Sequence, residues 1–421
     1  MNVLLIGSGG REHALAAKIC ESPKLTRLYA IPGNPGIGEL ATCLTAAGGN
    51  ADIVNLAKEK AIDLVVIGPE APLAAGLADE LTAAGIKVFG PTAKAAQIES
   101  SKKFAKDLMK EFSIPTAAYE TFTDAGAAKG YIKEHGAPIV IKADGLAAGK
   151  GVVVAETVDV ALAAIDNMMG AKNFGAAGET VVVEEFMRGE EASLLAFTDG
   201  ETVVPMLPAQ DHKRIFDGDR GANTGGMGAY APAPVMTAEL VETAMNEILR
   251  PTVAALKAKG YPYCGCLYAG LMITATGPKV VEFNARFGDP ETQAVLPLLE
   301  SDLTEIMLSC AEGKLSADKV RFTDKAAACV IMASAGYPGD YAKGAAITGI
   351  DEARDAGCLV FHAGTTQKDG ELVTSGGRVL GVTAVADDIS AAVRKAYEGV
   401  EKIHFDGAYY RRDIAHRALR K

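Results

Sequence analysis

The stretch KVVEFNARFGDPETQ, residues 279–293, decides the class of fold. Its first half alternates polar and apolar residues, the pattern of a strand with one buried face. Glu282, Asn284 and Arg286 fall on one face, and apolar residues occupy the other. Two oxygen donors at that spacing suit a magnesium ion that nucleotide phosphates also bind, and arginine suits a phosphate. The stretch therefore predicts a nucleotide and metal site on a strand.

A glycine-rich link follows a second apolar run in IVIKADGLAAGKG. Lys142 closes the run, and a lysine buried there requires an anion. The link after it combines three glycines with a lysine, namely Gly145, Gly149, Gly151 and Lys150. Its backbone N–H groups could close over phosphates, although the GK pair lacks the Ser or Thr of a P-loop. A plain glycine hairpin is the alternative.

Two further segments carry clustered polar residues. VVVEEFMRGEEAS places Glu184 at the end of a strand and Glu191 after a turn. Such a linker could offer a backbone edge to adenine and a carboxylate to ribose, although acidic clusters are usually solvated surface. DHKR (Asp211–Arg214) and NTGGMG (Asn223–Gly228) lie in a loop that is too long for a connector, and we interpret it as substrate-facing.

The first hundred residues predict a complete α/β domain. Four runs indicate strands, at Val3–Ile6, Arg27–Ile31, Asp63–Ile67 and Lys87–Phe89. Helical patterns separate them, at Arg11–Ser22, Asp52–Lys60 and Leu73–Ala84, and a long helix is expected at Ala93–Phe112. This alternation predicts a parallel, Rossmann-like sheet that is covered on both faces.

The turn GSGGREHA after the first strand resembles a dinucleotide fingerprint only in part. Glu12 holds the third glycine position, and no acid for a ribose hydroxyl ends the second strand, which disfavours NAD. A helix N-terminus with free N–H groups at Gly9 and Gly10 suits a phosphate, and Arg11 could add a charged contact. Glu70 follows the third strand and could line the same cleft or merely cap a helix.

Changes in the pattern of expected strands and helices along the sequence predict three domains. Residues 1–100 form the N-terminal domain, residues 101–324 a larger module with an inserted lid at about 119–190, and residues 325–421 a small α+β domain. The fold class is thus a multidomain combination of α/β and α+β.

Composition restricts the class of function. The net charge is −11, which gives no general attraction to nucleic acid or to anionic membranes. Seven scattered cysteines argue against a disulfide framework and against a zinc site. The start of the chain lacks the features of a signal peptide, and no apolar run reaches membrane-spanning length. We therefore expect a cytoplasmic protein.

Together these segments resemble the ATP-grasp superfamily and, within it, the glycinamide ribonucleotide synthetase family (phosphoribosylamine–glycine ligases). The resemblance covers the whole chain in order and rests on nine motifs: GSGGREHAL, GPEAPL, SSKKFAK, IKADGLAAGKGV, VEEFMRGEEAS, QDHKR, NTGGMGAYAP, VEFNARFGDPETQ and SGGRVLGV. It implies an ATP-grasp module with a lid. It also implies ligation of glycine to 5-phosphoribosylamine in purine synthesis through an acyl phosphate, with ATP as co-substrate and Mg2+ or Mn2+ as metal.

The resemblance also implies roles for residues. Lys102, Lys142 and the 145–151 link would hold phosphates, Glu184, Phe186 and Met187 would meet adenine, and Glu191 would meet ribose. The metal would bind Glu282 and Asn284. The substrates would contact Gly9, Gly10, Arg11, Glu70, Asp211, Lys213, Gly226 and Arg286, of which Asp211 and Arg286, with Lys142, would be catalytic. Relatives carry a further acid upstream of the Glu-x-Asn pair, where this chain reads LYAGLMI, which implies fewer protein ligands for the metal.

Other functions stay open on the residues alone. They are a sister ATP-grasp ligase, a nucleotide-sensing protein without turnover, and a dehydrogenase. The expected partners are small molecules, without nucleic acid or membrane, and the expected state is a monomer or a weak homodimer. Arg378 in SGGRVLG either reaches the active site or caps a surface hairpin.

Overall fold

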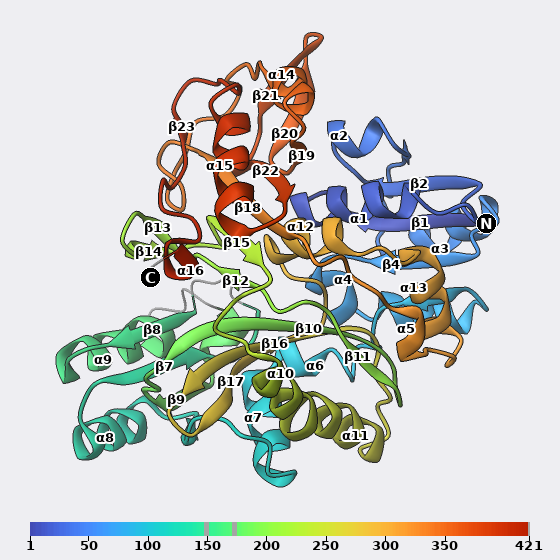
Figure 1. Ribbon diagram of the computed structural model, residues 1–421. Helices are drawn as coiled ribbons and strands as arrows, with labels where there is room; N and C mark the ends of the chain where they lie inside the picture. Colours follow the sequence, from blue (N-terminus) through green and yellow to red (C-terminus); the bar gives the residue numbers. More distant parts are fainter. Residues whose placement is uncertain (147–150, 171–174, 420–421) are drawn as a thin grey trace.

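The structure is a computed structural model that describes residues 1–146, 151–170 and 175–419. Figure 1 shows the N-terminal segment in blue beside the C-terminal segment in red, with the green and yellow central segments below both. Among the described helices, none combines the length and the apolar character that crossing a bilayer requires.

The N-terminal domain is built on a five-stranded parallel sheet in the order β3-β2-β1-β4-β5. The strands are β1 (Asn2–Gly7), β2 (Arg27–Pro32), β3 (Thr42–Cys43), β4 (Leu64–Ile67) and β5 (Lys87–Phe89). Side chains of β1 alternate between two buried clusters, with Leu4 and Ile6 in one and Val3 and Leu5 in the other. Burial on both faces is the reason why these strands are continuous apolar runs, and it confirms the predicted sheet.

The helices of this domain are α1 (Gly10–Cys20), α2 (Pro35–Gly38), α3 (Asn50–Glu59), α4 (Glu70–Ala74), α5 (Leu77–Ala83), α6 (Gln97–Ser100) and α7 (Lys102–Glu111). Two predicted helices are wrong as single elements. The one expected at Leu73–Ala84 breaks at Gly76, which has the left-handed φ of +80°. The one expected at Ala93–Phe112 breaks at Ser101, whose extended backbone and side-chain acceptor start α7 as an N-cap.

The central segment contains two antiparallel sheets, as expected for a module with an inserted lid. The lid sheet, in the order β6-β9-β7-β8, consists of β6 (Tyr119–Phe122), β9 (Val181–Glu185), β7 (Ile139–Ala143) and β8 (Val152–Ala155). The helices α8 (Ala125–His135) and α9 (Val158–Ile165) pack on it around an apolar cluster of their own. The second sheet consists of β11 (Val203–Pro205), β10 (Glu190–Asp199), β16 (Cys264–Thr274) and β17 (Gly277–Asn284).

Between β15 (Gly228–Ala231) and β16 the chain is helical, with a π-helical turn, Met245–Leu249, between α10 (Ala238–Ala244) and α11 (Arg250–Ala258). After β17 come α12 (Glu291–Val295) and α13 (Leu303–Ala311).

The C-terminal sheet includes strands from an earlier part of the chain. Its order is β12-β15-β18-β22-β19, and β23 pairs with β18. The bounds are β12 (Gln210–Asp211), β15 (Gly228–Ala231), β18 (Ala326–Ser334), β22 (Arg378–Ala386), β19 (Leu359–His362) and β23 (Ala408–Tyr409). The polar segment that we interpreted as one loop therefore contributes β12 and β15, and between them the hairpin strands β13 (Arg214–Phe216) and β14 (Arg220–Asn223). Periodicity cannot reveal strands of two to four residues.

The remaining C-terminal elements are α14 (Ile350–Asp355), β20 (Thr365–Lys368), β21 (Glu371–Thr374), α15 (Ile389–Val400) and α16 (His416–Leu419). The whole arrangement confirms the predicted mixture of an α/β domain, a lidded central module and a small α+β domain.

One glycine of the C-terminal domain offers a test of the packing. Gly349 has φ +85°, and a Cβ there would clash with the Lys402 carbonyl oxygen. Gly370 has the same φ, and no described atom lies within 4 Å of the position that a Cβ would take there. We expect Gly349→Ala to destabilise the protein by about 2–4 kcal/mol, because strain and clash add. Gly370→Ala, with strain alone, should cost about 1 kcal/mol. Equal changes in the thermal unfolding midpoint would contradict the assigned contact.

Candidate active site

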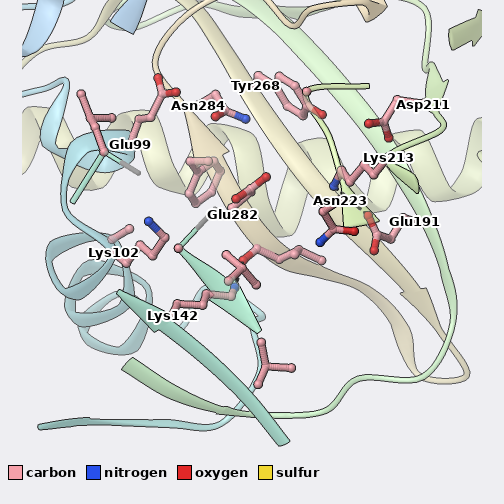
Figure 2. A pocket seen from close by; sticks show the side chains of 18 of the residues that line it. Glu99, Lys102, Lys142, Glu191, Asp211, Lys213, Asn223, Tyr268, Glu282 and Asn284 are labelled. Atoms are coloured by element: carbon pink, nitrogen blue, oxygen red, sulfur yellow. Dashed lines mark hydrogen bonds and ion pairs between the residues drawn. The ribbon is translucent and has the colours of Figure 1, made fainter. Parts of the chain in front are cut away.

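A cavity of about 570 Å³ lies where the lid, β17, the segment from β12 to β15 and both terminal domains meet. Figure 2 shows Glu282 between the lysines Lys102 and Lys142 on one side and Asp211 with Lys213 on the other. Most of the predicted site residues line this cavity: Arg11, Glu70, Lys102, Lys142, Gly145, Gly151, Glu184, Phe186, Met187, Glu191, Asp211, Lys213, Glu282, Asn284 and Arg286.

Some predicted residues lie elsewhere. Gly9, Gly10 and Gly226 are not among the residues that line the cavity, although Gly225 is. Gly149 and Lys150 lie outside the described residues.

Lys142 is buried, as its place at the end of an apolar strand predicts, and its ammonium group pairs with a carboxylate of the protein. Its Nζ lies 3.0 Å from Oε1 of Glu184 and donates to the Val281 carbonyl at 2.8 Å. Lys106 approaches the other oxygen of Glu184 at 3.2 Å. All three charged side chains are at most 5% exposed. Burial lowers the pKa of Lys106 to about 8, although Glu184 acts against it.

This triad leaves one positive charge in excess, which prepares the cavity wall for an anionic ligand. Lys102 adds a further cation, held by a hydrogen bond from its Nζ to the Gly145 carbonyl at 2.9 Å. Burial lowers the pKa of Lys102.

The opposite wall is the cavity-facing side of β17 and the residues that directly follow it. Asn284 accepts a hydrogen bond from Arg286 at 3.2 Å. Arg286 pairs with Glu99 at 2.9 Å and with Glu70 at 3.3 Å. Burial acts to raise the pKa of Glu70, but the Arg286 and Arg11 cations outweigh it and hold the pKa below its usual value.

Glu99 escaped the sequence reasoning. It lies in a short helix of an unremarkable segment, and only tertiary packing brings it beside Arg286 and the Ala285 N–H, which it accepts at 2.7 Å. Burial raises the pKa of its carboxyl.

Side-chain oxygens of Glu282 and Asn284 face the cavity from one side of a strand. Carboxylate and amide oxygens are hard donors of the kind that Mg2+ takes together with nucleotide phosphates, so these residues fit the implied metal. In the described parts of the chain, no three His, Cys, Asp or Glu side chains converge on one point.

Asp211, in β12, and Lys213, just before β13, reach the cavity from the segment between β12 and β15. Lys213 pairs with Glu191 at 2.7 Å, and this cation holds the pKa of Glu191 below its ordinary value. Burial raises the pKa of Asp211 to about 7. The Lys213 cation acts against this shift, and the Glu291 and Glu191 carboxylates act with it.

Next to Asp211 lies a buried acid that the sequence reasoning missed. Glu291 accepts hydrogen bonds from Tyr268 at 2.6 Å and from Ser193 at 3.0 Å, and it lines the cavity. Glu291 is part of the DPETQ sequence at the end of the opening stretch. A helix begins there, and the sequence alone does not show which of its side chains point into the cavity.

Arg378 does reach the site from the C-terminal domain. It donates to the carbonyls of Gly225 at 2.7 Å and Asp289 at 2.9 Å, and its charge faces the Asp289 carboxylate at 3.3 Å. The C-terminal domain therefore forms part of the cavity wall and fixes the glycine run beside it.

The glycine turn after β1 differs from expectation. The Gly9 N–H, predicted to be free for a phosphate, donates to Oε2 of Glu12 at 2.6 Å. The other oxygen of Glu12 pairs with Arg11 at 2.5 Å. Glu12, the residue at the third glycine position of the fingerprint, therefore already occupies the Gly9 N–H with its own carboxylate.

Asp211 gives a pH-dependent prediction. Its ordinary pKa lies near 3.9, so between about pH 4 and pH 7 the unfolded chain has lost a proton that the folded chain retains. Stability from this group is therefore lost as pH rises through that window. Asp211→Asn should gain stability relative to wild type over the same window, by about 1.4 kcal/mol for each pH unit. Thermal unfolding of both proteins without ligands, across this pH range, measures the difference in stability. Asp324 is exposed, and Asp324→Asn serves as the control, whose difference from wild type should not change with pH.

Three models of one family match the chain in sequence order: the phosphoribosylglycinamide synthetase N domain over residues 1–99, its ATP-grasp (A) domain over 100–292, and its C domain over 327–417. A phosphoribosylamine–glycine ligase of Rhizobium meliloti is 56% identical over 420 residues, which are 100% of this chain and 99% of the relative.

Solved structures agree. The phosphoribosylamine–glycine ligase of Thermotoga maritima superposes with a TM-score of 0.86 at 35% identity, covering 99% of this chain and 100% of that one. The biotin carboxylase domain of Hydrogenobacter thermophilus 2-oxoglutarate carboxylase, solved with MgADP and bicarbonate, has a TM-score of 0.75 at 18% identity, covering 97% and 91%, a likeness of fold alone.

The lid, the antiparallel sheet and the cavity between them define an ATP-grasp enzyme. Within that class the models account for nearly the whole chain. The chain belongs to the phosphoribosylglycinamide synthetase family.

Proposed function

We propose that this protein joins glycine to 5-phosphoribosylamine with the hydrolysis of ATP, forming glycinamide ribonucleotide, ADP and phosphate in purine synthesis. The observation that carries the proposal is one cavity with three kinds of group: the cations Lys102 and Lys142, the oxygen donors on β17, and the Asp211–Lys213 pair. The relatives that match over their full length bear the name of this reaction.

The reaction proceeds in two steps. A glycine carboxylate oxygen attacks the γ-phosphorus of ATP, the bond to the β-phosphate breaks, and glycyl phosphate and ADP form. The amine of phosphoribosylamine then attacks the acyl carbon, the C–O bond to phosphate breaks, and the amine loses a proton. Positioning and electrostatic stabilisation supply the rate, with no covalent enzyme intermediate.

The nucleotide lies between the lid and β17. Lys102 and Lys142 neutralise phosphate charge as the γ-phosphoryl group transfers, and Gly145 and Gly151, near the two ends of the glycine-rich link, lie on the same side of the cavity. Glu184, Phe186 and Met187 lie at the adenine end, and Glu191 at the ribose. The Glu184 carboxylate already holds two lysines, so its removal also disturbs the phosphate side.

Glu282 and Asn284 would hold the divalent cation, Mg2+ or Mn2+. The ion supplies charge neutralisation on the phosphates when it is bound.

The other substrates occupy the remaining cavity. Arg286, fixed by Glu70 and Glu99, faces the transferring phosphoryl group. Asp211, with its raised pKa, is suited to take the proton of the attacking amine, and Lys213 and Gly226 shape the same end. The phosphate of phosphoribosylamine lies toward Gly9, Gly10 and Arg11. Binding there requires Glu12 to release the Gly9 N–H.

We further propose that the protein acts in the cytoplasm as a monomer or weak homodimer, which sedimentation analysis would decide.

The test is phosphate release from ATP, with phosphoribosylamine generated in place and each substrate omitted in turn. Release that requires both glycine and the amine supports the proposal. Release that is independent of glycine assigns the chain to a sister ligase. Tight ATP binding without release overturns catalysis and favours a nucleotide-sensing protein.

A further inference from the structure

The segment that carries Asp211 and Lys213 is held from behind by the end of the chain. Asp211 and Lys213 line the cavity, whereas His212 between them points away from it, with its side chain fully buried. The His212 Nε2 accepts the backbone N–H of Ala415 at 2.9 Å. One imidazole thus joins the strand that bears two cavity residues to residues 411–417, which we name the C-terminal tail.

Arg411 makes the strongest connection. Its side chain is fully buried. The guanidinium donates to both oxygens of Asp413 at 2.7 and 2.8 Å, to Asp219 at 2.9 Å, and to the Arg214 carbonyl at 3.0 Å. Asp219 and Arg214 belong to the β13–β14 hairpin, which spans 214–223, so this arginine fixes the hairpin by side chain and backbone together.

Other contacts tie the same two segments. Arg417 donates to Asp219 at 2.7 Å, the Arg412 N–H donates to Asp217 at 2.9 Å, and the Gly218 N–H donates to Asp413 at 2.8 Å. Figure 1 shows α16, at the end of the tail, beside β13 and β14.

The hairpin in turn is continuous with the cavity. The Lys213 carbonyl accepts the Thr224 N–H at 2.7 Å, and the His212 carbonyl accepts the Met227 N–H at 2.8 Å. A movement of the hairpin therefore moves the backbone on which Asp211 and Lys213 stand. Misplacement of a binding group by about 1 Å can cost as much as 100-fold in rate, so such support has catalytic weight.

We propose that the C-terminal tail sets the position of Asp211 and Lys213 for the amino-acid and amine substrates, with Arg411 and His212 as positioning residues. The substrate assignment rests on the proposed function. In the described structure the tail does not touch Lys102, Lys142 or β17, against which the ATP phosphates would lie. Lys213 does pair with Glu191 at the proposed ribose end, so we expect glycine binding to change much more than ATP binding.

The experiment compares Arg411→Met with Arg412→Met. Both remove one positive charge, but the Arg412 side chain is exposed and only its backbone contacts the hairpin. We expect Arg411→Met to raise the KM for glycine about tenfold or more while ATP binding stays within about twofold. Hydrogen exchange should accelerate in residues 211–223. Arg412→Met should change none of these.

A second pair covers the case in which Arg411→Met does not fold. His212→Leu removes the acceptor of the Ala415 N–H, whereas His212→Gln keeps one, so glutamine should restore the glycine KM that leucine raises. Equal values for the two overturn the proposal. The proposal is also overturned if hydrogen exchange in the hairpin is unchanged in Arg411→Met. Equal losses of glycine binding and ATP binding overturn it as well. A wild type without glycine-dependent release refutes the proposed function instead, and the exchange comparison still decides whether the tail holds the hairpin.

Discussion

Glu282→Ala is expected to reduce glycine-dependent phosphate release by about 10²–10³-fold. The carboxylate lies on the cavity face of β17 beside Asn284, within the field of Lys102. Its removal takes away the charged half of the proposed metal ligands, at the point where negative charge gathers as the phosphoryl group transfers. The loss should fall mainly on kcat, because the interaction strengthens in the transition state.

Two further measurements make this result specific. Mg2+ should strengthen ATP binding to wild type, and this dependence should largely vanish in Glu282→Ala. The thermal midpoint should stay close to wild type, since among the described residues Glu282 forms no ion pair that would be broken. Full activity, or an equal loss with an unchanged Mg2+ dependence, would refute the metal assignment.

Glu184→Gln is expected to give a large loss of stability, of about 3–5 kcal/mol at neutral pH. The substitution leaves Lys106 and Lys142 buried without the carboxylate that both contact at 3.2 and 3.0 Å. Since the pKa of Lys106 is already lowered to about 8, raising the pH should discharge it in the variant and recover part of the stability. Thermal unfolding across pH 7 to 10 measures both effects.

The neighbour Glu185 provides the matched control. It belongs to the same strand but is exposed, and among the described residues its side chain has one hydrogen bond, which it accepts from the Ala118 backbone N–H at 3.2 Å. Glu185→Gln should therefore lie within about 0.5 kcal/mol of wild type. Similar losses of stability in the two variants, or a loss of stability in Glu184→Gln that does not change with pH, would show that the buried triad does not have the proposed charges.

The sequence predicted those parts of the fold whose signals are local. The parallel strands of the N-terminal domain are continuous apolar runs because both faces are buried, and β17 alternates because only one face is. The breaks at Gly76 and Ser101 were missed, since a helical period continues through a single turn. The strands β12 and β15 were not predicted because they are only two and four residues long, and because β18, which pairs with β15, lies about a hundred residues further along the chain.

The residues of the candidate site also divide into those that the local sequence predicts and those that it does not. Lys142 and Glu282 were predicted because each lies in a strand where a charged side chain stands out against the pattern of apolar residues, and Arg286 because it continues that pattern two residues after β17 ends. Glu99 and Lys106 were not, since each becomes significant only through a partner contributed by another segment. The sequence did not predict that the Gly9 N–H is already hydrogen-bonded, because a glycine motif does not show which carboxylate side chain lies beside it.

The sharing of one sheet between two stretches of chain has a consequence for dissecting the protein. β15 pairs with β18 along four residues, Gly228 to Ala231, so a cut near residue 325 would separate the two sides of a hydrogen-bonded ladder. A fragment ending there would expose β15 as an unprotected edge, and the remainder would expose β18, an entirely buried apolar strand. Each piece would then tend to pair with foreign strands, and the two should recover solubility when they are produced together.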